Sequence, residues 1–167
     1  MSPTPPKARS LSELSTPEPR LSLPVDELDA LFQAEEAKLN PGVPHEVRQR
    51  ITTTRNLAVY GGFSYDLFTV SYYWSFTCVE MAIWQRSQEA ESAKPGDKAT
   101  LKPLLEWAHK HDLLPEHLSD PKQVATLADI RNFLTHPKRV NNLLTPNWAY
   151  DAFVDMVKVM NSLWPTG

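Results

Sequence analysis

Apolar residues recur at intervals of three and four along most of the chain, which is the pattern of amphipathic helices. No segment shows sustained alternation of apolar and polar residues, and no Asn-Gly hairpin signal occurs. The pattern therefore predicts an all-α fold, a compact antiparallel bundle of five to six helices.

Turn residues divide the N-terminal half into two helices, expected over residues 24–37 and 44–60. Asn40-Pro41-Gly42 separates them, and Gly61-Gly62 ends the second. The longest helix is expected over residues 64–91. It is apolar on more than one face, which predicts either a central place in the bundle or a face shared with another chain, and the sequence does not choose between them.

Three later helices begin at capping signals. Thr100 opens a short helix that is expected to reach Leu114. Asp120-Pro121 opens the next, which Pro137 ends, and Thr145-Pro146 opens the last. Proline is favoured in the first turn of a helix, where the missing N–H costs no hydrogen bond.

The first twenty residues contain five of the fifteen prolines and almost no large apolar side chains. Such a segment cannot offset the entropy lost on ordering, so residues 1–21 are expected to form a disordered tail and residues 22–167 one helical domain. The N-terminus lacks a basic stretch followed by an apolar core, and the uncharged run 67–79 is too short for a membrane span. These features predict a cytoplasmic protein without a membrane segment.

The distribution of charges and of potential metal ligands limits the kinds of site that the chain is expected to contain. The net charge is −3, and the sequence predicts no broad basic face of the kind that binds long nucleic acids. The lone Cys78 is expected to be a small packed hydrophobe. His109 and His111 would point to opposite sides of a helix, so no metal site and no cofactor are expected.

The candidate catalytic residues are Arg131, Asn132 and His136, near the end of the helix that is expected to start at Pro121. Asn132 and His136 are four residues apart and share a helix face, while Arg131 lies about 7.5 Å along the axis from His136. A histidine in the last turn feels the negative end of the helix dipole, which favours its protonated form. An arginine beside a protonatable histidine suits a phosphodiester.

The spacing Arg-Asn-x-x-x-His, late in a helix and followed by proline, resembles the signature of the HEPN superfamily. The order of helices around it resembles that superfamily as well, from the aromatic helix ending in Glu80-Met81-Ala82-Ile83-Trp84 through the run 104–115, so the resemblance covers roughly residues 64–163. The toxin branch of the family carries a tyrosine two residues after the histidine, where this chain has Lys138. The resemblance therefore does not extend to that branch or to control through that tyrosine.

The resemblance implies a dimeric, metal-independent endoribonuclease, in a stress-response or anti-phage setting. Arg131 would stabilise charge on the phosphate, His136 would act as general acid or base, and Asn132 would orient the imidazole or a phosphate oxygen. Lys138 and Arg139 would contact RNA. Glu80 and Asp129 would support the site, with Glu80 as an ion partner that positions Arg131.

Three alternatives remain open at the level of sequence. The cluster can be purely structural, with His136 capping a carbonyl and Arg131 paired with Asp129 or Glu80. The chain can be a non-catalytic HEPN-like module that binds RNA, or that assembles with a separate effector or a protein inhibitor. It can also be a regulator that binds a small molecule against the aromatic helix.

Overall fold

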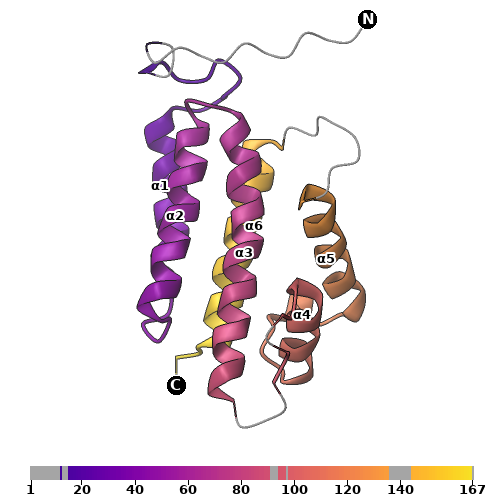
Figure 1. The fold of residues 1–167 in the computed structure, drawn as a ribbon. Coiled ribbons are helices and arrows are strands. Elements are labelled where there is room, and N and C mark those ends of the chain that lie inside the picture. The colour runs from indigo at the N-terminus through magenta and orange to yellow at the C-terminus, as the bar shows by residue number, and fades with distance from the viewer. Residues whose placement is uncertain (1–11, 13–14, 91–93, 97, 136–143, 167) are drawn as a thin grey trace, which may run out of the picture.

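A computed structural model describes residues 12, 15–90, 94–96, 98–135 and 144–166. These residues form six α-helices and one short 3₁₀ helix, and they contain no strand. The elements, shown in Figure 1, are α1 (Val25–Glu36), α2 (His45–Gly61), α3 (Asp66–Glu89), α4 (Leu101–Lys110), η2 (Glu116–Leu118), α5 (Pro121–Thr135) and α6 (Pro146–Leu163). The all-α prediction is confirmed.

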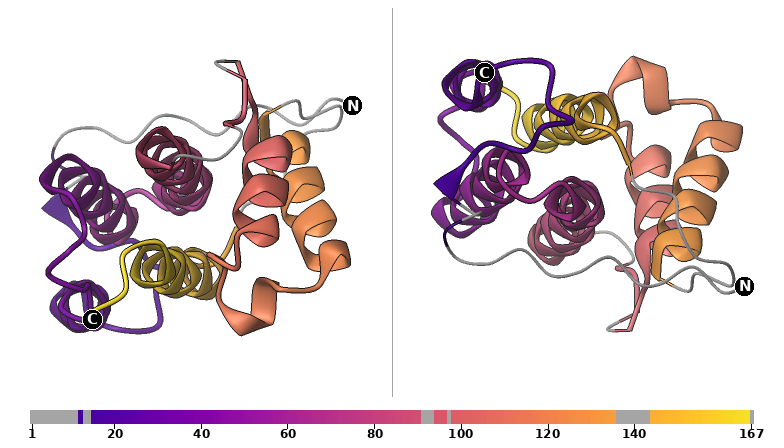
Figure 2. Two further views of the ribbon diagram at one scale, coloured as in Figure 1. Left: turned by 90° about the horizontal axis from the view of Figure 1, so that it is seen from below. Right: turned by 90° about the horizontal axis from the view of Figure 1, so that it is seen from above.

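The helices lie in three neighbouring pairs when the bundle is viewed along its length (Figure 2). Helices α1 and α2 form one outer pair, α4 and α5 form the other, and α3 and α6 occupy the centre. Side chains from all six helices meet in one continuous apolar core. A single core agrees with one folded unit.

Helix α3 lies in the centre of the bundle, which is one of the two positions that its sequence predicted. Phe68, Phe76 and Ile83 are buried on it, together with seven further residues of the same helix. Val70 and Trp84 remain 41% exposed.

Within the described ranges, no helix is both long enough and apolar enough to cross a membrane.

The end of α4 differs from the sequence prediction, because the helix stops at Lys110 and does not reach Leu114. Asp112 adopts a left-handed conformation with φ of 55°. The Leu113 amide donates to the Ala108 carbonyl at 3.0 Å, and the Asp112 amide donates to the His109 carbonyl at 3.1 Å. These two bonds form a Schellman motif, which closes the helix and satisfies its last carbonyls.

Part of the predicted tail packs against the bundle. The Glu18 amide donates to the Gly62 carbonyl at 2.7 Å, and Glu18 is 7% exposed. The guanidinium of Arg20 lies 4.2 Å from the centre of the Tyr65 ring. Residues 15–21 therefore contribute to the folded unit, although their composition assigned them to the tail.

Candidate functional site

The described part of the predicted site is organised by an ion pair between α5 and α3. Nη2 of Arg131 donates to both carboxylate oxygens of Glu80, at 3.0 and 3.2 Å. The Arg131 side chain is 19% exposed and the Glu80 side chain 17%. A partly buried guanidinium held in this way has a defined orientation close to the surface of the bundle.

The position of Arg131 follows from the buried stripe of α5. Asp120 accepts a hydrogen bond from the Lys122 amide at 2.8 Å, which fixes the start of the helix. Val124 and Ala128 then face the bundle and are 3% exposed. Arg131 is seven residues after Val124 and three after Ala128, so it continues that stripe and reaches α3.

The structure brings together only some of the residues that the sequence singled out. Arg131 and Glu80 are in contact, whereas Asn132 and Asp129 are exposed on α5. His136, Lys138 and Arg139 lie outside the described residues. Their proximity to Arg131, and with it the complete triad, stays a prediction.

The chemistry available to this arrangement is recognition of an anion by a held arginine. A guanidinium carries five N–H donors in a planar fork, and Nη2 of Arg131 donates to both carboxylate oxygens of Glu80. Glu80 also compensates the charge of Arg131, because the two side chains form an ion pair. One such site is a weak attractor for a polyanion, and charge from neighbouring residues or a second copy would strengthen it.

The histidine-rich segment after α4 has structural contacts. Nδ1 of His111 lies 2.8 Å from the Trp107 carbonyl oxygen, and its ring stacks on Trp107 with centroids 4.4 Å apart. Nε2 of His117 lies 3.2 Å from Oδ1 of Asp155 on α6. Across the described parts of the chain, no group of three or more His, Cys, Asp or Glu side chains could hold a metal ion.

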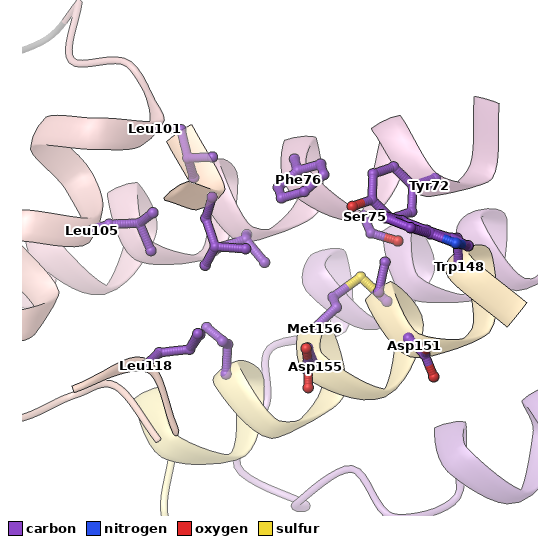
Figure 3. A pocket seen from close by; sticks show the side chains of 14 residues that line it. Tyr72, Ser75, Phe76, Leu101, Leu105, Leu118, Trp148, Asp151, Asp155 and Met156 are labelled. Atoms are coloured by element: carbon purple, nitrogen blue, oxygen red, sulfur yellow. The ribbon is translucent and has the colours of Figure 1, made fainter. Parts of the chain in front are cut away.

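The structure also contains a cavity that motif analysis did not locate. It has a volume of about 280 Å³ and lies where α3, α4 and α6 meet, with one residue each from η2 and α5 (Figure 3). Tyr72 and Trp148 form part of its wall, and Asp151 and Asp155 also line it. The available signal was the shared face of Trp148, Asp151 and Asp155 on the last helix, at intervals of three and four.

Comparison of this chain with known proteins returned no matching family model, no matching curated protein and no matching solved structure. Membership of the HEPN superfamily therefore stays a prediction, which is based on the residues of the motif and on the order of the helices around it.

Proposed function

We propose that this chain is a metal-independent endoribonuclease that acts as a homodimer through Arg131, Asn132 and His136. The observation that carries the proposal is the Arg131–Glu80 ion pair, which holds a guanidinium near the surface in the last turns of α5. Asn132 follows it directly and is exposed. His136 follows four residues after Asn132 in the sequence and enters the proposal through the sequence motif alone.

The reaction in this proposal is transesterification of RNA. The 2′-oxygen attacks the adjacent phosphorus and loses its proton to a base, while the bond from phosphorus to the 5′-oxygen breaks. The products are a cyclic phosphate and a 5′-hydroxyl that has taken up a proton. Arg131 stabilises the charge on the phosphoryl oxygens, His136 moves a proton, and Asn132 orients the imidazole or a phosphate oxygen.

Dimerisation would raise the positive charge around the site, which is weak in a single copy. Two copies placed with their motifs together would double Arg131, Lys138 and Arg139 around one cleft. Val70 and Trp84 are exposed on α3, the helix that carries Glu80, and their spacing of fourteen residues puts them on roughly the same face. That face offers apolar surface for a second copy.

One observation favours a second function, that of a non-catalytic module for RNA binding or assembly. Glu80 compensates the charge of Arg131, and the pair also joins α5 to the centre of the bundle. An arginine used in this way can be purely structural. The net charge of −3 points in the same direction.

Cleavage of mixed cellular RNA in EDTA separates the two functions. Wild type, His136→Ala and the control His45→Ala would be compared, since His45 is exposed at the start of α2. The ribonuclease proposal expects products with cyclic phosphate ends from wild type and from His45→Ala, and none from His136→Ala. Equal cleavage by all three proteins would contradict the proposed site. RNA binding without cleavage by the dimer would support the module.

A further inference from the structure

The cavity between α3, α4 and α6 is large enough for a small organic ligand. Its volume of about 280 Å³ exceeds the cavities of roughly 150 Å³ that hold a benzene ring in other proteins. Most of its lining is apolar, including Phe76, Leu101, Leu105 and Met156. An apolar ring with a short chain would therefore gain burial there.

Two carboxylates give the α6 wall of this cavity a negative charge. Asp151 and Asp155 line it from α6 and stand one helical turn apart, as Figure 3 shows. Asp155 is already engaged by His117 at 3.2 Å and by Lys158 at 3.1 Å. Asp151 is exposed, and no cation of the described chain is in ion-pair contact with it. Asp151 is thus the carboxylate open to a ligand.

Aromatic rings line the same cavity. The rings of Tyr72 and Trp148 lie 6.2 Å apart at 59° to each other, and both line the cavity. Trp148 is 53% exposed, which is unusual for the largest apolar side chain. Negative aromatic faces next to a carboxylate attract an ammonium group, whereas they repel an anion. The pKa of Tyr72 is raised by burial and then by the charges of Asp155 and Asp151, which agrees with a negative potential inside this wall.

We infer that this cavity is a binding site for a small amphipathic amine, with its apolar body between α3 and α4 and its ammonium group at Asp151, Trp148 and Tyr72. The site is separate from the proposed RNA site, since none of its lining residues is Arg131, Asn132 or Glu80. The inference therefore does not depend on ribonuclease activity.

Calorimetric titration of the full chain with three matched probes tests the inference. Phenylpropylamine carries the ammonium group, phenylpropanol replaces it with a neutral hydroxyl, and phenylpropionate replaces it with an anion. The amine is expected to bind about three- to thirtyfold more tightly than the alcohol, through one exposed ion pair and one cation–π contact. The carboxylate is expected to bind more weakly than the alcohol. Added salt should weaken the binding of the amine alone.

Two variants locate the binding. Asp151→Asn should remove the preference for the amine over the alcohol, whereas Asp26→Asn, an exposed aspartate on α1, should preserve it. Ala152→Phe places a ring in the cavity and should abolish binding of all three probes in a protein shown to be folded by its thermal unfolding. The inference is overturned if the amine does not bind wild type, if amine and alcohol bind equally, or if Asp151→Asn behaves like Asp26→Asn.

Discussion

The Arg131 guanidinium on α5 lies 3.0 Å from the Glu80 carboxylate on α3, although the two residues are 51 positions apart in the sequence. Helix α5 belongs to an outer pair of the bundle, and α3 lies in its centre (Figure 1). The pair therefore joins the candidate site to the core. Because both side chains are partly buried, loss of one partner leaves the other charge poorly solvated.

Glu80→Gln and Arg131→Gln should each lower the free energy of unfolding by about 1–3 kcal/mol. The double variant should lose less than the sum of the two, because the second substitution removes a charge that the first left unpaired. Urea denaturation monitored by tryptophan fluorescence measures these differences. Glu106→Gln is the control, since Glu106 is exposed on α4, and it should change stability by less than about 0.5 kcal/mol. Strict additivity of the two single variants would contradict the coupling.

The sequence predicted the helices and offered Glu80 and Asp129 as partners of Arg131, but it did not predict most of the tertiary contacts. Asp120-Pro121 and Thr145-Pro146 define helix starts locally, and α5 and α6 begin at Pro121 and Pro146. The end of α4 was missed because Asp112 takes a left-handed conformation that glycine or asparagine would have signalled more clearly. The choice between Glu80 and Asp129 as partner of Arg131 depends on how α5 packs on α3, which local pattern does not encode. The same holds for the cavity, whose lining comes from several helices.

Cys78 should make stability fall at alkaline pH. Burial raises the pKa of its thiol from 9.0 to about 11. Between these two values the unfolded chain loses the proton and the folded chain keeps it, so the folded state binds more protons and its stability falls as pH rises. The shift corresponds to a loss of about 2–3 kcal/mol by pH 11 and of less than about 0.5 kcal/mol below pH 9.

Chemical denaturation of wild type and Cys78→Ala between pH 8 and 11 measures this contribution. The pKa values of Tyr72 and Tyr150 are also raised, so both proteins should lose stability and wild type should lose more. Cys78 is the single cysteine of the chain and is 1% exposed, so a thiol reagent should modify the native protein only as fast as it opens. Identical pH profiles for the two proteins would contradict the buried, neutral thiol.

Asn161→Ala should lower the free energy of unfolding by about 1–3 kcal/mol. Oδ1 of Asn161 accepts from the Asn40 amide at 2.8 Å, and its Nδ2 donates to the Lys38 carbonyl at 2.9 Å. These bonds tie the end of α6 to the connection between α1 and α2, and the alanine would leave a partly buried amide without its acceptor. Thermal unfolding would be compared with that of Asn147→Ala, an exposed position in the first turn of α6. Equal melting temperatures for both variants would mean that the two bonds are replaced by water at no cost.

Gly61→Ala should destabilise the protein by about 1–3 kcal/mol, because the end of α2 lies against the ring of Phe68. A Cβ at position 61 would be 2.8 Å from two ring carbons of Phe68, whose side chain is fully buried and has little room to move. Alanine gains helix propensity of about 1 kcal/mol over glycine, so the measured loss is the cost of overpacking minus that gain. Gly96→Ala is the matched control, since its Cβ would meet no atom within 4 Å, and it should be neutral or slightly stabilising. Urea denaturation of the two variants distinguishes overpacking from a general effect of replacing glycine. If the Gly61→Ala protein were as stable as the Gly96→Ala protein, α2 and α3 could separate at this point without a loss of stability, and the overpacking argument would be wrong.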